Sequence, residues 1–90
     1  MSERCAHLNA AASSNPAPSS ESGCEDCLAT GERLWAHLRM CTDCGHVGCC
    51  DSSPRQHASA HNRETGHPVV RSFEPGESWM WCYTDEQLGR

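Results

Sequence analysis

The chain has 90 residues, only 37% of them hydrophobic, and it carries a formal net charge of −5. One domain of this length buries about two thirds of the surface that its unfolded form exposes, so its core needs added support. All seven cations are arginines scattered along the chain, which argues against nucleic-acid binding because that normally needs a basic patch. No apolar run in the sequence is long enough to cross a membrane.

The N-terminal segment offers Cys5 and His7 as candidate metal ligands. Alternate side chains of an extended strand point to the same side, so a Cys-x-His pair can bind one ion with both side chains. The alternative is a disordered N-terminus with an incidental cysteine. Residues 8–23 are rich in Ala, Ser, Pro and Asn without periodicity, and we expect a flexible insertion there that only connects its neighbours.

Two Cys-x-x-Cys pairs follow, Cys24 with Cys27 and Cys41 with Cys44. This spacing closes a tight turn that points both sulfurs at one ion. Two such pairs in one short chain are a far stronger metal signal than a single pair. Between the pairs, the alternation of apolar side chains with others predicts a strand over 34–40.

Adjacent cysteines stand at Cys49 and Cys50. Neighbouring side chains diverge and rarely bind one ion, so one of the two is spare. We expect the nearby His37 and His46 to be solvated rather than to bind metal. The six histidines nevertheless favour metal binding over disulfide bonds. The sequence does not start with an apolar signal segment, so nothing in it argues for export to an oxidising compartment where disulfides form. We therefore predict a cytoplasmic zinc-binding protein.

A helix is predicted over about 53–66, with Ser53 as its N-cap. His57 and His61 are one turn apart on the same face of this helix, and His67 follows its end. Histidines at such spacing complete tetrahedral zinc sites that cysteine pairs begin. The glutamate of the H-E-x-x-H motif is missing, so a catalytic zinc protease is not expected.

The C-terminal part predicts a strand over 69–73 and a last strand over 79–83. With a period of two, Cys82 points to one face of the last strand and its aromatic residues point to the other. This stripe serves either as core or as a binding platform. Its members are Trp79, Trp81 and Tyr83.

Together these motifs resemble the UBP-type zinc finger, which occurs in ubiquitin-specific proteases and in a class of histone deacetylase. The resemblance covers the chain except residues 8–23 and the two tips. It implies an α+β fold in a single domain over 1–90, in which a small twisted antiparallel sheet packs against one main helix and two to three zinc ions are bound. The matching positions are Cys5-x-His7, Cys24-x-x-Cys27, Trp35, Cys41-x-x-Cys44-Gly45-x-x-x-Cys49, His57-x-x-x-His61, Gly66-His67 and Trp81-Cys82-Tyr83.

The resemblance also implies three ligand sets. Asp85 stands where the family has a cysteine, and aspartate is a legitimate though harder zinc ligand. Two alternatives are that Thr84 and Asp85 only start a terminal turn, or that Cys50 supplies the missing sulfur. The implied sets are Cys24, Cys27, Cys49 and His57; then Cys41, Cys44, His61 and His67; and then Cys5, His7, Cys82 and Asp85.

Family members that bind ubiquitin take its free C-terminal Gly-Gly tail into a pocket with aromatic walls. Trp35, Trp81 and Tyr83 match these wall positions. An Arg and a Tyr after Cys-Gly bond the tail in the family, but residues 50–52 of this chain are Cys, Asp and Ser. A carboxylate needs an arginine or backbone donors, and Asp51 would repel it. The resemblance therefore implies a free-standing, bacterial-type member with weak or no binding of this tail.

We predict a non-catalytic, zinc-binding module that recognises a protein or peptide, with a free C-terminal tail as one such ligand. The alternative function is a zinc- or redox-responsive protein in which Cys50 is the reactive thiol. An enzyme is not expected, because the sequence shows no open three-ligand metal site with a base.

Overall fold

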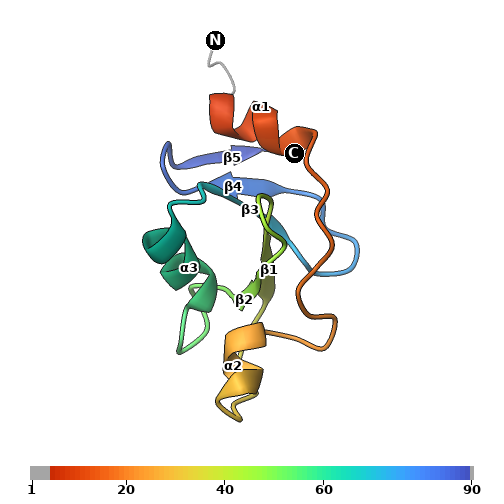
Figure 1. Ribbon diagram of the computed structural model, residues 1–90, viewed down its shortest axis with the longest axis vertical. Coiled ribbons are helices and arrows are strands. Elements are labelled where there is room, and N and C mark those ends of the chain that lie inside the picture. Colours follow the sequence, from red (N-terminus) through yellow and green to blue (C-terminus); the bar gives the residue numbers. More distant parts are fainter. Residues whose placement is uncertain (1–4, 90) are drawn as a thin grey trace.

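The computed structural model describes residues 5–89, which form a five-stranded sheet with three helices around it (Figure 1). The strand order is β2-β1-β3-β4-β5, and every neighbouring pair is antiparallel. The predicted α+β fold is therefore confirmed. Within the described residues, no helix is long and apolar enough to span a membrane. The elements are α1 (Ala6–Ala12), α2 (Glu25–Ala29), β1 (Leu38–Cys41), β2 (Val47–Cys49), α3 (His57–Thr65), β3 (Val69–Ser72), β4 (Met80–Cys82) and β5 (Gln87–Gly89).

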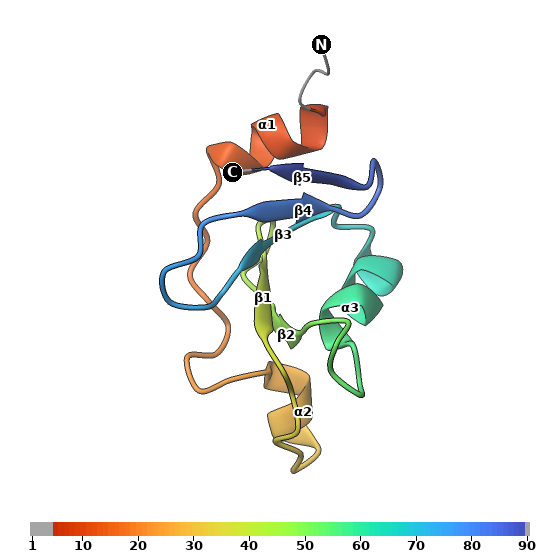
Figure 2. The same cartoon turned by 180° about the vertical axis from the view of Figure 1, so that it is seen from behind.

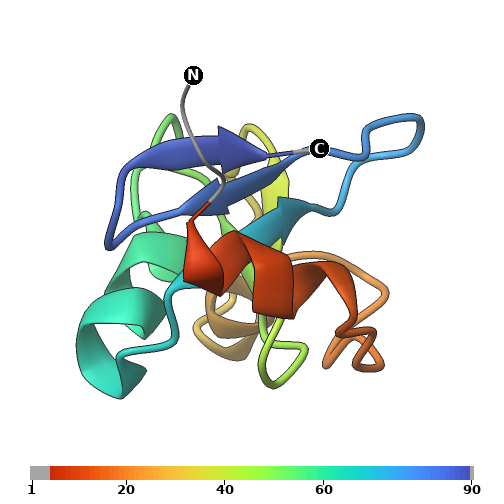
Figure 3. The same cartoon turned by 90° about the horizontal axis from the view of Figure 1, so that it is seen from above.

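The helices pack against different strands of the sheet. Helix α1 lies along β4 (Figure 3), and its Leu8 and Ala11 form one buried cluster with Val69, Met80 and Cys82. Helix α3 packs against β1 and β2, and α2 packs against β2. Helices α2 and α3 therefore meet at the end of the sheet that carries most of the cysteines.

Helix α1 corrects the sequence analysis, which predicted a flexible insertion from residue 8 onward. Cys5 caps this helix, because its sulfur accepts a hydrogen bond from the Leu8 N–H at 3.4 Å. Leu8 is fully buried and Ala11 is 4% exposed. Burial against distant strands stabilises the helix, and the composition of the segment does not reveal such packing.

Residues 13–23 contain no helix or strand and run from α1 at one end of the molecule to α2 at the other (Figure 2). Ser19 fixes this segment beside the edge strand β2. Its hydroxyl accepts a hydrogen bond from the Val47 N–H at 3.0 Å, and its own N–H donates to the Gly45 carbonyl at 2.8 Å. Such bonds satisfy polar groups that an edge strand would otherwise leave open.

Helix α3 begins at His57, later than predicted. Ser53 does not cap it, because the Ser53 hydroxyl accepts a hydrogen bond from the Ala36 N–H at 2.8 Å instead. The Cys49 sulfur accepts from the His57 N–H at 3.2 Å. The predicted end of the helix is confirmed, since Gly66 forms its C-cap in the left-handed region with φ 77°.

Strand β1 is shorter than the strand predicted over 34–40 and begins at Leu38. Pairing explains the difference, because β2 ends at Cys49 opposite Leu38. Beyond that pair, the His37 carbonyl still accepts a hydrogen bond from the Cys50 N–H at 3.0 Å, but the strand ladder does not continue. Leu34 is 76% exposed as a result.

The strands predicted over 69–73 and 79–83 are confirmed as β3 and β4, with shorter bounds. Strand β5 was not predicted, and neither were β2 and α2. Strand β5 follows a turn in which Glu86 has φ 51°, and it places Leu88 opposite Trp81.

Candidate metal centres and an aromatic pocket

The first group of candidate metal ligands joins three elements. It contains Cys24 ahead of α2, Cys27 within α2, Cys49 at the end of β2 and His57 at the start of α3. The His57 Nδ1 atom lies 3.2 Å from the first two sulfurs and 3.6 Å from the third. The Cys24 sulfur accepts a hydrogen bond from the Cys27 N–H at 3.4 Å, which closes the turn expected from their spacing.

The second group uses the same helix α3. It contains Cys41 at the end of β1, Cys44 in the following turn, His61 within α3 and His67 just after it. The His67 Nδ1 atom lies 3.4 Å from the Cys41 sulfur and 3.3 Å from the His61 Nε2 atom. The Cys44 sulfur lies 3.3 Å from that same Nε2 atom. Helix α3 thus carries a histidine of each of the first two groups.

The third group brings the two ends of the described chain together. It contains Cys5, His7, Cys82 and Asp85. The His7 Nδ1 atom lies 2.9 Å from an Asp85 carboxylate oxygen and 3.6 Å from the Cys82 sulfur. The predicted extended strand is wrong here, because Cys5 caps α1 and His7 lies in its first turn. The structure brings Asp85 rather than Cys50 to this group.

The geometry of these groups fits zinc. In each group the candidate ligand atoms all lie within 4.8 Å of one another. A tetrahedral zinc ion with bonds of about 2.3 Å to sulfur and about 2.0 Å to nitrogen separates its ligand atoms by about 3.3–3.8 Å. The sulfur–nitrogen and nitrogen–nitrogen contacts within the groups fall close to this range. All eight cysteines are free thiols, which argues against the disulfide alternative.

Protonation of the candidate ligands follows their surroundings. Burial raises the pKa of the Cys27 thiol to about 12 and that of Cys41 to about 11. A zinc ion must therefore displace protons from these thiols when it binds. Asp85 behaves oppositely, because its hydrogen bond with His7 lowers the pKa of its carboxyl group.

An aromatic pocket with a volume of about 280 Å³ opens on the other face of β4. Met80 and Cys82 face α1, whereas Trp81 points to the opposite side, as the alternation predicted. The pocket confirms that the three aromatic residues of the predicted stripe share one face. Its lining consists of Arg39, Cys50, Asp51, Ser52, Val70, Trp79, Trp81, Tyr83 and Leu88.

Trp35 does not line this pocket, which corrects its predicted role as a wall. Its ring packs with Leu38 on the cysteines of the first metal group. The ring also lies against Gly23, where an added Cβ would be 2.2 Å from the Trp35 Cζ2 atom. Trp35 therefore shields the first metal group instead of contacting a ligand in the pocket.

Two of the residues that line the pocket are charged, Arg39 and Asp51. The Arg39 guanidinium lies 4.4 Å from the centre of the Trp79 ring, a cation–π contact, and it donates to the Leu38 carbonyl at 3.0 Å. Asp51 accepts a hydrogen bond from the hydroxyl of Ser59 on α3. Sequence analysis had placed Asp51 at this site but had not assigned Arg39 to it.

Cys50 stands apart from the three metal groups and is only 5% exposed. Burial opposes ionisation of its thiol, but hydrogen bonds from the Ser53 hydroxyl and from the backbone N–H groups of Ser52 and His37 outweigh it. These bonds lower the pKa of Cys50 to about 7.

Comparison with known proteins identifies the family. A family model described as "Zn-finger in ubiquitin-hydrolases and other protein" matches residues 24–88. The chain is a UBP-type zinc finger. It is 38% identical over 60 residues to ubiquitin carboxyl-terminal hydrolase 44 of Ailuropoda melanoleuca. That stretch is 67% of this zinc finger but only 7% of the length of the hydrolase.

A solved structure extends the likeness beyond the matched residues. The solution NMR structure of protein RPA1320 from Rhodopseudomonas palustris superimposes with a TM-score of 0.82 at 47% sequence identity. The match covers 99% of this zinc finger and 83% of that chain. Family membership and the Cys/His groups together show that this UBP-type zinc finger binds zinc, with room for two to three ions.

Sequence analysis missed one polar residue near the metal groups. His46, expected to be solvated, has a side chain only 14% exposed, and its Nε2 atom lies 2.7 Å from the Asp26 carboxylate. No spacing rule signals this contact, because it depends on how α2 meets the turn before β2.

Proposed function

We propose that this zinc finger is a non-catalytic interaction module whose aromatic pocket receives a protein or peptide segment, with a free C-terminal tail as the best-suited ligand. The single observation that supports it most is the pocket of about 280 Å³ with three aromatic side chains and Arg39 in its wall. Aromatic rings pack well on an extended peptide, and an arginine suits a carboxylate.

In this proposal the zinc ions have structural roles, and each candidate group is a complete four-ligand set. Closed sets of cysteine and histidine are typical of structural zinc, whereas catalytic zinc keeps a position open for water. Thiolate ligands also suit a reducing compartment, so the proposal places the protein in the cytoplasm. The ligand sets are Cys24, Cys27, Cys49 and His57; Cys41, Cys44, His61 and His67; and Cys5, His7, Cys82 and Asp85.

Ubiquitin itself is expected to be a poor ligand of the native pocket. The related hydrolase is named for the carboxyl terminus of ubiquitin, but Asp51 places a negative charge in this pocket. Asp51 disfavours a carboxylate placed near it, while Arg39 favours one near the Trp79 wall. We therefore propose a tail whose carboxylate approaches Arg39 and whose sequence differs from Gly-Gly.

An array of peptides, each made once with a free C-terminus and once with an amidated C-terminus, tests this function. The zinc-loaded protein should bind a subset of peptides with free C-termini and lose them when the same peptides are amidated. Trp81→Ala should abolish this binding without loss of zinc, and Trp35→Phe, outside the pocket, is the matched control. Equal binding of amidated peptides, or no effect of Trp81→Ala, would contradict the proposal.

The second candidate function uses Cys50 as a responsive thiol. Of the eight cysteines, all within the described residues, it alone lies outside the metal groups, and it lines the pocket. A modification at Cys50 would change the shape of the pocket without removing a metal ligand. Alkylation of the zinc-loaded protein, located by mass spectrometry, should then occur at Cys50 alone. Modification of the zinc ligands at the same rate would argue against this role.

A further inference from the structure

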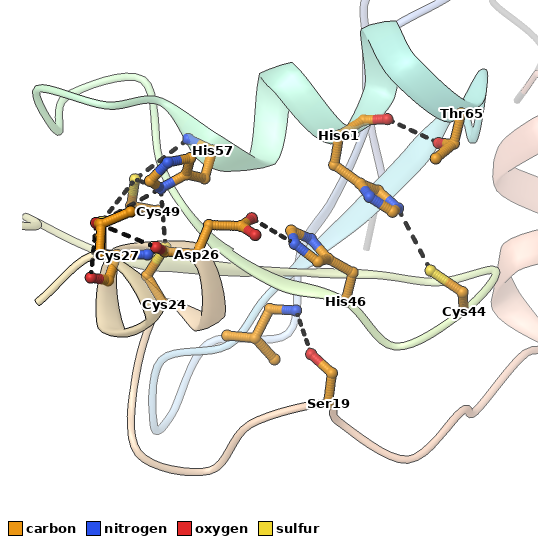
Figure 4. A network of polar contacts seen from close by, with 12 residues as sticks. Ser19, Cys24, Asp26, Cys27, Cys44, His46, Cys49, His57, His61 and Thr65 are labelled. Carbon is orange, nitrogen blue, oxygen red and sulfur yellow. Dashed lines mark hydrogen bonds and ion pairs between the residues drawn. The ribbon is translucent and has the colours of Figure 1, made fainter.

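His46 lies between the first two metal groups (Figure 4). Its Nε2 atom is 2.7 Å from the carboxylate of Asp26, which stands between Cys24 and Cys27 in the chain. The flat side of the His46 ring stacks on His61, with 4.1 Å between the ring centres and 6° between the ring planes. The side chain of His46 is 14% exposed and that of Asp26 is 46% exposed, so the His46 ring is largely shielded from water while the carboxylate it contacts stays partly in solvent.

We propose that His46 is a positioning residue that couples these two zinc sites, so that they fill together. This inference rests on the ligand sets proposed above but concerns a residue outside them. His46 orients His61 through the ring stack, and it orients the turn between Cys24 and Cys27 through Asp26. A zinc ion at one site fixes one end of this series of contacts. The other site then loses less conformational freedom when its own ion binds.

The ring stack takes the place of the hydrogen bond that usually orients a histidine ligand. A histidine ligand is usually oriented by a hydrogen bond from its second ring nitrogen. The His61 Nε2 atom faces Cys44 and His67, and within residues 5–89 no hydrogen bond reaches its Nδ1 atom. A parallel ring at 4.1 Å restricts the tilt of the His61 imidazole. That tilt decides where the lone pair of Nε2 points, so the stack bears directly on metal binding.

The backbone already links the two sites, because α3 carries both His57 and His61. His46 adds a second link through side chains, so its removal should weaken the coupling and leave both ligand sets intact. A cavity of about 430 Å³ lies beside these residues, and Glu64 also lines it. Glu64 makes no hydrogen bond with His46 in the described part of the chain. It therefore serves as a matched control for a change of side chain in the same cavity.

A zinc titration of the metal-free full chain, followed by ¹⁵N NMR of the histidine rings, tests this inference. The metal-bound nitrogens of His57 and His61 report the two sites separately, and a competing chelator gives their relative affinities. In the native protein both histidines should become metal-bound at the same zinc ratio. In His46→Ala, His61 should lag, and its site should lose roughly 10–100-fold in affinity, as is typical when an outer partner of a ligand is removed. Glu64→Gln should behave like the native protein.

Two conservative variants separate the two contacts of His46. His46→Phe keeps a flat ring but loses the bond to Asp26, so the His61 site should keep near-native affinity while the sites fill at different zinc ratios. Asp26→Asn keeps a hydrogen-bonding group and should restore the joint filling that Asp26→Ala loses. These variants also decide the question if His46→Ala fails to fold at saturating zinc.

Several results would overturn the inference. The inference fails if the two zinc sites of His46→Ala fill at the same zinc ratio and the His61 site keeps its affinity. It also fails if the two sites still fill together both in His46→Phe and in Asp26→Ala. An equal loss in Glu64→Gln would show that the effect is not specific to His46. If His57 and His61 of the native protein never become metal-bound, the proposed ligand sets themselves are wrong. This outcome is distinct from a failure of the coupling through His46.

Discussion

Gly48 of β2 and Ala58 of α3 approach so closely that no side chain fits between them. A Cβ atom at Gly48 would lie 2.7 Å from the Ala58 backbone nitrogen and 3.0 Å from its Cα atom. The residues next to them in the chain, Cys49 and His57, belong to the first metal group, and the His57 N–H donates to the Cys49 sulfur. The missing side chain at Gly48 therefore allows these two candidate ligands to meet.

Gly48→Ala should lower the free energy of unfolding by about 1–3 kcal/mol, because the added methyl group overpacks the contact between β2 and α3. Zinc affinity at the first group should fall as well, which chelator competition measures beside thermal unfolding. Gly76→Ala is the control. Nothing lies within 4 Å of its Cβ position, but its φ of +82° makes a side chain strained. It should lose stability by about 1 kcal/mol without a change in zinc affinity. Unchanged zinc affinity in Gly48→Ala would contradict this account.

Local patterns were enough to predict part of the fold. The alternation of side chains predicted β3 and β4, and the glycine stop predicted the end of α3. The start of α3 was wrong, because the Ala36 N–H uses the Ser53 hydroxyl. Helix α1 was missed because its support comes from Leu8 packing on strands far along the chain. Both errors arise from long-range contacts, which a short window of sequence does not contain.

The same distinction holds for the functional site. Ligands that are close in sequence are constrained by local geometry, and the structure gathers all predicted metal positions into three groups. Strand alternation put Trp81 and Tyr83 on one face, the family resemblance implied that they form pocket walls, and both line the pocket. Trp35 was misplaced because only its position in the family pattern assigned it there. The neighbours of His46 come from α2 and α3, so its contacts depend on tertiary packing and had no signal in the sequence.

Removal of zinc should unfold the protein. The largest fully buried side chains include Leu8, Val47 and Val69, but five of the nine such side chains are cysteines of the metal groups. Structural zinc sites contribute apparent binding energies of about 10–16 kcal/mol each in small domains, which is as large as the whole net stability of a typical domain, about 5–15 kcal/mol. Chelation at neutral pH should therefore collapse the amide dispersion in the ¹H–¹⁵N NMR spectrum, and added zinc should restore it. Dispersion that persists in a verified metal-free sample would show that the core folds without metal.

The three groups should differ in their importance for folding. Cys41 is 1% exposed and belongs to a group with four cysteine and histidine donors. Asp85 has a side chain 40% exposed and supplies a harder oxygen donor near the end of the chain. Cys41→Ser and His61→Ala should thus lower the melting temperature and the zinc content far more than Asp85→Ala does. Thermal unfolding measures the melting temperature, and native mass spectrometry measures the zinc content. Equal losses in all three variants would mean that the third group is as structural as the others.

Reversing the charge at Asp51 should create tail binding in the pocket. An arginine there offers a charge-assisted hydrogen bond to a carboxylate, which contributes about 1.5–3 kcal/mol, or roughly a ten- to hundredfold gain in affinity. Asp51→Arg, with Cys50→Gly and Ser52→Tyr for a full pocket, should therefore bind the Gly-Gly tail of ubiquitin more tightly than the native protein does. Calorimetric titration with ubiquitin, and with ubiquitin lacking its last two residues, measures the gain and its dependence on the tail. Trp81→Ala in the Asp51→Arg protein should remove the gain without loss of zinc. Tight, tail-dependent binding by the native protein would instead mean that Arg39, already in the pocket wall, replaces the arginine that the family has at position 51.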